Sequence, residues 1–272
     1  RGYCLGTDQD KLSLSGLAAN LDEYGMSCQP EIQDCVTSTN ALVRERAAEG
    51  APEGLVILAN QQTAGRGRLG RDFYSPPDTG LYLSLLLRPR QMQPQHATRI
   101  TTMAALAACE AIEAVTQQQP QIKWVNDIFL EGKKVCGILT EGSFNLETGQ
   151  LDDVVVGVGF NVYPPAGGFP PEIAEIADSI LQKQHSGTKN KLAAAFLNFF
   201  FQIYRGENDY ASAYRARSMV IGKSIVVSTP TASRNASALD IDRDCRLIVR
   251  YEDGSIASLS SAEVSIRTEG MH

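Results

Sequence analysis

The chain has 272 residues, 43% of them hydrophobic and 21% charged, a balance typical of a folded globular protein. Its formal net charge of −6 gives no overall attraction to nucleic acid or to an anionic membrane. Six scattered cysteines without a C-x-x-C pair, and only three histidines, predict neither a metal site nor a disulfide framework and are typical of a reducing cytoplasm. Without a signal peptide or an apolar run near the roughly 20 residues that cross a bilayer, we expect a cytoplasmic protein with no membrane partner.

The first half of the chain alternates apolar helical and strand patterns around one polar segment. A modest helical stripe covers residues 12–21, and the remainder of 1–31 is mixed, so we treat 1–31 as an N-terminal remnant or linker. Periodicity predicts helices over 37–48 and 98–115 and strands over 55–59 and 81–87. Residues 60–80 are rich in Gly, Pro and Arg, which is typical of a long loop.

The second half changes character near residue 222. Before that point the pattern predicts strands over 121–124, 128–130, 135–141 and 154–158, a loop over 164–171, and helices over 191–203 and 209–218. After it, short strands are predicted over 225–228, 236–241, 246–251 and 255–259, and Asp253-Gly254 is a strong hairpin signal. We therefore expect a main domain over 32–220 and a small all-β domain over 221–272.

The long loop contains Gly-Arg-Gly-Arg-Leu-Gly-Arg at residues 65–71. This matches the G-x-G-x-x-G fingerprint, but a dinucleotide loop must open a helix, and here Asp-Phe-Tyr-Ser-Pro-Pro follows. Glycines let a backbone approach a ligand closely, and guanidinium groups match phosphate and carboxylate oxygens. A flexible basic loop on the surface is the alternative, although its place directly after an apolar strand favours a held loop.

A second unusual segment reads Lys-Trp-Val-Asn-Asp at residues 123–127 and is followed by Lys-Lys-Val-Cys-Gly-Ile-Leu at 133–139. The structural alternative is a core tryptophan, a turn at Asn-Asp and two solubilising lysines at a hairpin tip. The functional interpretation is a site that activates a carboxylate with ATP. Such a site brings two anions together, so it needs fixed cations beside the α-phosphate.

Taken together, these segments closely resemble those of the biotin–protein ligases. The resemblance rests on Gln-Thr-Ala-Gly-Arg-Gly-Arg at 62–68, the segment 123–127, Lys-Val-Cys-Gly-Ile-Leu at 134–139, Ser-Thr-Asn at 38–40 and Gly-Val-Gly-Phe-Asn at 157–161. Their order and approximate spacing match from about residue 32 to the C-terminus. One such motif would be weak evidence, whereas several in the family's order are strong evidence.

The resemblance implies an α+β fold, in which a central mixed β-sheet flanked by helices (the class II synthetase-like catalytic domain) carries a small C-terminal SH3-like β-barrel. It implies an ATP-dependent ligase that forms biotinyl-5′-AMP from biotin and MgATP. The biotin then passes to a specific lysine of a biotin carboxyl carrier domain. ATP with Mg²⁺ and biotin are substrates, and no tightly bound prosthetic group is expected.

The resemblance also assigns site residues, position by position. It implies catalytic roles for Lys134, Arg66 and Arg68. The implied contacts to biotin or its adenylate are Ser38, Thr39, Asn40, Gln62, Gly65, Arg66, Gly67, Arg68, Trp124, Lys134, Gly137 and Gly159. The implied ATP contacts are Arg71, Asn126 and Asn161, and the segment 164–180 resembles the family's adenylate-binding loop. Two positions depart from the pattern, since Val125 replaces the usual Pro and Phe73 a frequent Trp.

Alternative functions remain open at this stage. Lipoate or octanoate transferases share the core fold but lack the double Gly-Arg loop. A non-catalytic biotin sensor would have no need of Lys134. Some family members carry a winged helix-turn-helix and repress the biotin operon; some thirty N-terminal residues cannot supply that domain, so we expect operator binding only from a longer parent chain. Homodimers occur in the family and are a candidate assembly here.

Overall fold

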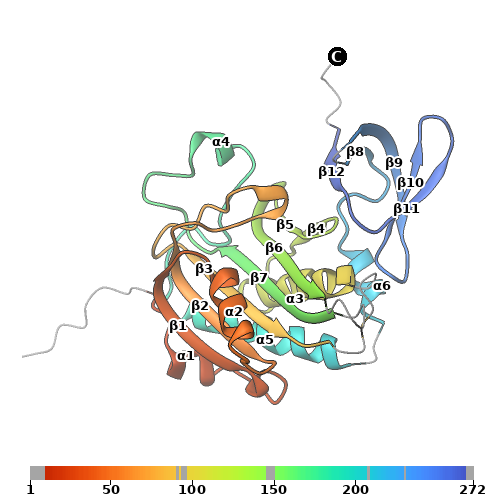
Figure 1. Cartoon of the computed structure of the whole chain (residues 1–272). Helices are drawn as coiled ribbons and strands as arrows, with labels where there is room; N and C mark the ends of the chain where they lie inside the picture. The colour runs from red at the N-terminus through yellow and green to blue at the C-terminus, as the bar shows by residue number, and fades with distance from the viewer. Residues whose placement is uncertain are drawn as a thin grey trace, which may run out of the picture.

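A seven-stranded mixed sheet lies at the centre of the larger part of the molecule (Figure 1). The computed structural model describes residues 10–89, 92, 97–144, 151–206, 209–229 and 231–267. The sheet order is β1-β2-β3-β7-β6-β5-β4. Its strands are β1 (Gln29–Val36), β2 (Leu55–Gln62), β3 (Gly80–Leu87), β4 (Gln121–Lys123), β5 (Asp127–Leu130), β6 (Lys133–Phe144) and β7 (Leu151–Asn161). Among the described strands, β1 and β2 are the only neighbours that pair in parallel, because helix α2 (Thr39–Ala48) carries the chain back between them.

Helices cover both faces of this sheet. Alternate residues of a strand face opposite sides, and β2 shows this directly. Ile57 packs with Val43 of α2, whereas Leu58 joins the cluster that includes helices α3 (Ala97–Thr116) and α5 (Thr188–Arg205). Helix α6 (Tyr210–Ala216) leads from this layer to the C-terminal strands. Within the described residues, no helix is both long and apolar enough to cross a lipid bilayer.

A five-stranded antiparallel sheet forms the C-terminal part, which Figure 1 shows beyond α6 and beside β4. Its order is β11-β10-β9-β8-β12. The strands are β8 (Ser224–Ser228), β9 (Ser233–Ile241), β10 (Leu247–Tyr251), β11 (Ile256–Leu259) and β12 (Glu263–Ile266). Together with the mixed sheet and its helices, this confirms the predicted α+β class with a small β-rich C-terminal unit.

The predicted helices and strands are present, with shifted ends, but two strands, one short α-helix and two 3₁₀ turns were not predicted. Strands β1 and β12 and the one-turn helix α4 (Pro171–Ala174) each carry too few regularly spaced apolar residues to be recognised. The stripe predicted over 12–21 forms only the short helix α1 (Leu14–Ala18), which is followed by a 3₁₀ turn, η1 (Gly25–Ser27). The boundary expected between residues 31 and 32 falls inside β1, a strand of the main sheet.

Candidate active site

A cavity opens where the N-terminus of α2, the loop 63–79 and strands β6 and β7 meet. Thirteen of the residues expected at the site line it: Ser38, Thr39, Asn40, Gln62, Arg66, Gly67, Arg68, Arg71, Asn126, Lys134, Gly137, Gly159 and Asn161. The loop 162–180 closes another side through Phe169, Ile173, Ile176 and Ala177. Residues that are far apart in the sequence therefore surround one space. Two expected residues, Gly65 and Trp124, are not among the lining residues.

Glycines make one wall of the cavity flat. Gly137 of β6 and Gly159 of β7 are paired across the two strands. A Cβ added at Gly159 would lie 2.4 Å from Phe73 Cε1, and one added at Gly137 would lie 3.2 Å from Lys134 Nζ. These positions therefore leave room for the Phe73 ring and the end of the Lys134 side chain. The phenylalanine that replaces the family's usual tryptophan lies directly on this wall.

Lys134 is held from two directions at the edge of the cavity. Its ammonium pairs with Asp127 at 2.6 Å, and both side chains remain partly exposed at 29% and 23%. Its backbone N–H donates to Ile176 O at 2.8 Å, and its carbonyl accepts from Asp178 N at 2.9 Å. The loop 162–180 is thus hydrogen-bonded to β6 at Lys134. A cation whose position is fixed in this way suits an anionic reaction centre.

A second lysine, Lys123, lies behind this ion pair. Burial is the main cause that lowers the pKa of Lys123, while the nearby Asp127 carboxylate opposes the shift and the Lys134 ammonium adds to it. The Lys123 ammonium also lies 5.9 Å from the centre of the Phe129 ring. The positive charge around Asp127 therefore comes from two lysines, of which only Lys134 lines the cavity.

The arginines of the loop 63–79 connect the cavity to the C-terminal sheet. Arg68 donates to Asn126 Oδ1 at 3.0 Å and to Ala262 O at 3.4 Å. Arg71 pairs with Glu263 of β12 at 2.5 Å. Glu263 also lines the cavity, and it was not expected there because β12 was not predicted. The C-terminal sheet thus contributes to the site and closes one side of it.

Gly65 lets the two sides of the loop 63–79 approach each other closely. Phe73 N donates to Gly65 O at 2.9 Å, so the two sides of the loop are paired. A Cβ added at Gly65 would lie only 2.5 Å from Phe73 O. Gly65 is therefore needed for the close approach of two backbone segments, while its neighbours Arg66 and Gly67 reach the cavity.

The opposite end of the cavity is a buried hydrogen-bond network around the start of α2. Ser38 caps this helix, and Thr39 N donates to Gln62 Oε1 at 2.9 Å. Ser84 Oγ of β3 donates to Asn40 Oδ1 at 2.6 Å and also lies 2.7 Å from Thr39 Oγ1. Ser84 was not predicted to support the site, nor was Glu141, which accepts from Asn40 Nδ2 at 2.7 Å. Period-two alternation along β6 could have placed Glu141 on the same face as Gly137.

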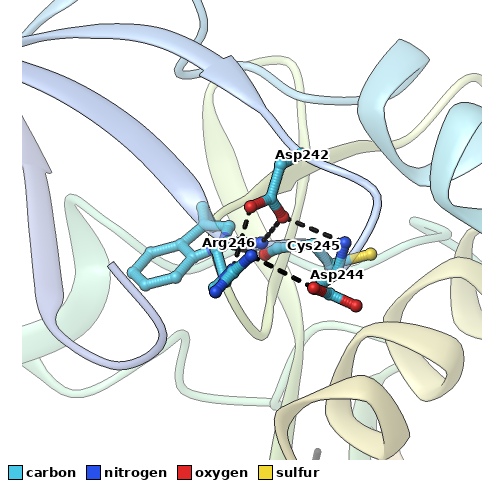
Figure 2. Close-up of polar contacts among 5 residues, drawn as sticks. Asp242, Asp244, Cys245 and Arg246 are labelled. Carbon is cyan, nitrogen blue, oxygen red and sulfur yellow. Dashed lines mark hydrogen bonds and ion pairs between the residues drawn. The ribbon is translucent and has the colours of Figure 1, made fainter. Parts of the chain in front are cut away.

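Trp124 corrects one expectation, because it belongs to the contact between the two sheets. It is 3% exposed and donates from Nε1 to Cys245 O at 2.9 Å. Cys245 lies in a tight turn in which Asp242 accepts from the backbone N–H groups of Asp244 and Arg246 (Figure 2). The indole was expected at the ligand. Instead, it points from the end of β4 into the core, and its only N–H group donates to this turn. The adjacent Val125 is buried too, and its carbonyl accepts from Tyr214 OH at 3.0 Å.

A Trp124→Phe substitution tests this placement. We expect the free energy of unfolding to fall by about 1–3 kcal/mol, because the buried Cys245 carbonyl loses its partner. Far-UV circular dichroism in urea measures this, since the substitution removes the only tryptophan fluorophore. The KM for any small substrate should stay within about twofold of the wild-type value. A large increase in KM with unchanged stability would contradict this placement and indicate that Trp124 contacts the ligand.

Comparison with known proteins agrees with this geometry. Residues 32–161 match the model of the Biotin/lipoate A/B protein ligase family, and residues 220–267 match the Biotin protein ligase C terminal domain. The chain is 32% identical to the bifunctional ligase/repressor BirA of Bacillus spizizenii, over 98% of this chain and 82% of that protein. It is 33% identical to the biotin–[acetyl-CoA-carboxylase] ligase of Mycobacterium tuberculosis, over 77% of this chain and 79% of that protein.

A comparison with solved structures also finds a biotin protein ligase. The biotin protein ligase of Aquifex aeolicus in complex with biotin and ATP superposes with a TM-score of 0.69 at 26% identity, covering 88% of this chain and 98% of that one. The fold and the site thus define a member of the wider biotin and lipoate ligases. Within that class, the chain belongs to the biotin protein ligase family.

Proposed function

We propose that the cavity is the active site of an ATP-dependent biotin–protein ligase. The observation that carries this proposal is the meeting of Lys134, the Gly-Arg loop and the buried network of α2 around one cavity, in a chain of this family. One end of the cavity offers fixed cations for a carboxylate and phosphates. The other end offers buried hydrogen-bonding groups for a polar head group.

The first half-reaction joins two anionic substrates, biotin and MgATP. A biotin carboxylate oxygen attacks the α-phosphorus, the bond to the β-phosphate oxygen breaks, and pyrophosphate leaves with its electron pair. We assign Lys134 to the α-phosphate and the attacking carboxylate, where it offsets the charge that gathers in the transition state. We assign Arg66 and Arg68 to the adenylate, and Arg71, Asn126 and Asn161 to the ATP side. Mg²⁺ enters as part of the nucleotide substrate.

The second half-reaction transfers the acyl group. The neutral amine of an acceptor lysine attacks the acyl carbon of biotinyl-5′-AMP, and the bond between that carbon and the phosphate oxygen breaks. AMP leaves with the electron pair of this bond, and the nitrogen releases one proton to solvent as the amide forms. We propose a biotin carboxyl carrier domain as the acceptor, because the Mycobacterium tuberculosis relative is named for acetyl-CoA carboxylase. The loops 63–79 and 162–180, which both line the cavity, would shield the anhydride from water between the two steps.

Two assays test this function against its rivals. Biotin should drive exchange of labelled pyrophosphate into ATP, and the protein should then biotinylate an apo carrier domain with MgATP. Lipoate or octanoate in place of biotin should give little exchange, since the double Gly-Arg loop separates this chain from those transferases. Biotin binding without exchange or transfer would instead indicate a non-catalytic sensor.

Several wider properties remain proposals. We propose a cytoplasmic location, which the unpaired described cysteines and the need for ATP support. A homodimer is supported by β1, which among the described strands pairs only with β2 and so leaves one edge for a second copy. We propose operator DNA as a partner only for a longer parent chain with a DNA-binding domain. We retain 1–31, 32–220 and 221–272 as the proposed division of the chain.

A further inference from the structure

The side-chain amide of Asn40 is buried and hydrogen-bonded at both ends. It is 4% exposed, and Gly157 provides the space for it, because a Cβ there would lie 2.0 Å from Asn40 Oδ1. Its Nδ2 donates to Glu141 Oε2 at 2.7 Å and weakly to Leu139 O at 3.4 Å. Its Oδ1 accepts from Ser84 Oγ at 2.6 Å.

The Glu141 carboxylate fixes which way this amide points. Exchanging the amide oxygen and nitrogen would bring two acceptors together at the Glu141 contact, where a charged carboxylate can only accept. Asn40 Oδ1 therefore faces Ser84, and the single hydroxyl hydrogen of Ser84 is committed to it. Arg44 pairs with the other Glu141 oxygen at 3.1 Å from the solvent side.

This orientation leaves the buried end of the cavity short of donors. Ser84 Oγ also lies 2.7 Å from Thr39 Oγ1, and Thr39 Oγ1 lies 3.1 Å from Gln62 Oε1. Two hydroxyl hydrogens must therefore serve three contacts between oxygens. Gln62 cannot relieve the shortage, because its Oε1 already accepts from Thr39 N and its Nε2 donates to Ser75 Oγ at 3.0 Å. Such a surface favours a head group that brings its own N–H donors.

We propose that Glu141 is a positioning residue that selects the head group of the acid substrate. Through Asn40 and Ser84 it keeps the buried end of the cavity rich in acceptors. That end suits a cyclic urea with N–H donors and disfavours a head group without donors, such as a dithiolane. The inference rests on the proposed function, because it takes biotin as the acid.

The test compares Glu141→Ala and Glu141→Gln with two control variants, Arg44→Ala and Glu45→Ala. Arg44 touches only the solvent side of Glu141, and Glu45 is an exposed carboxylate on the same helix. Steady-state exchange gives KM for biotin, KM for MgATP and kcat. Calorimetric titration gives the affinities for biotin and for lipoate separately.

We expect Glu141→Ala to raise the KM for biotin about tenfold or more, as the loss of a charged hydrogen-bond partner would. Glu141→Gln should be affected less, because its amide oxygen can still accept from Asn40. The kcat at saturating biotin, the KM for MgATP and the weak affinity for lipoate should all stay within about twofold, as should every value for the two control variants.

Three results would overturn the inference: an unchanged KM for biotin in Glu141→Ala, an equal loss for biotin and lipoate, or an equally large loss in Arg44→Ala. A wild-type protein that fails to exchange pyrophosphate with biotin is a different outcome. It would refute the ligase function itself, and the inference with it.

Discussion

Lys134→Ala is expected to slow biotin-dependent pyrophosphate exchange by about 10²–10³-fold, the usual loss when one fixed donor to a transition-state charge is removed. Lys134 lines the cavity, and both its ammonium and its backbone are held in place. The loss should fall mainly on kcat, because the charge it offsets develops as pyrophosphate leaves. The affinity for biotin, measured by titration without ATP, should change far less.

The fold should tolerate this substitution. The Lys134–Asp127 pair is partly exposed, so breaking it should lower the free energy of unfolding by only about 0–1 kcal/mol. Lys133→Ala is a matched control from the same strand, since the Lys133 ammonium contacts Ala174 O at 3.4 Å and does not line the cavity. We expect its exchange rate to stay within about threefold of wild type. Wild-type turnover by Lys134→Ala would refute the assigned role and favour a site built on other cations.

Gly157→Ala is expected to raise the KM for biotin by about 10- to 100-fold. The added methyl group would lie 2.0 Å from Asn40 Oδ1 and 2.8 Å from Asn40 Cγ, so the buried amide must move. Overpacking of this kind typically costs about 1–3 kcal/mol, and each 1.4 kcal/mol is about tenfold in affinity. The KM for MgATP should change less, because the hydrogen bonds of the Asn40 side chain go to Ser84, Leu139 and Glu141, none of which is assigned to ATP.

Gly142→Ala provides the control on the adjacent strand. Its nearest contact would be Leu151 Cδ2 at 3.1 Å, which is the end of an apolar side chain and lies outside the cavity lining. We expect its KM for biotin to stay within about twofold of wild type. If both variants lost biotin affinity equally, general damage to strands β6 and β7 would explain the result better than displacement of Asn40.

Elements whose apolar residues repeat regularly along the chain were predicted. Strands that depend on pairing with a distant strand were missed. Strand β3 and helix α3 were found because their apolar residues recur with the period of the element. Strand β1 was missed because Gln29, Pro30 and Glu31 carry no such period, and its stability comes from pairing with β2. Strand β12 was missed because only Val264 and Ile266 of its four residues are apolar, and its stability comes from pairing with β8.

In the candidate site too, motifs predicted residues, whereas the contacts between those residues became visible only in the structure. Thirteen of the fifteen residues expected from the resemblance line the cavity, but the resemblance did not describe their contacts. Trp124 was expected at the ligand because the resemblance to the family motif implied it, yet its indole reaches Cys245, 121 positions along the chain. Asp127 was noted only as a turn residue, and the structure pairs it with Lys134.

The local properties of this protein could be predicted from its sequence: most of the helices and strands, the Gly-Arg loop, the hairpin at Asp253-Gly254 and the set of chemical groups available. These features depend on the spacing of apolar residues and on the backbone conformations that individual residues can adopt. Both are properties of residues that are close together in the sequence. Which of these groups come into contact depends on how the chain folds in three dimensions. Glu141 fixes the amide of Asn40 across 101 positions, and Arg68 reaches Ala262 across 194. Such contacts form only when strands and loops pack together, so the pattern of neighbouring residues in the sequence cannot predict them.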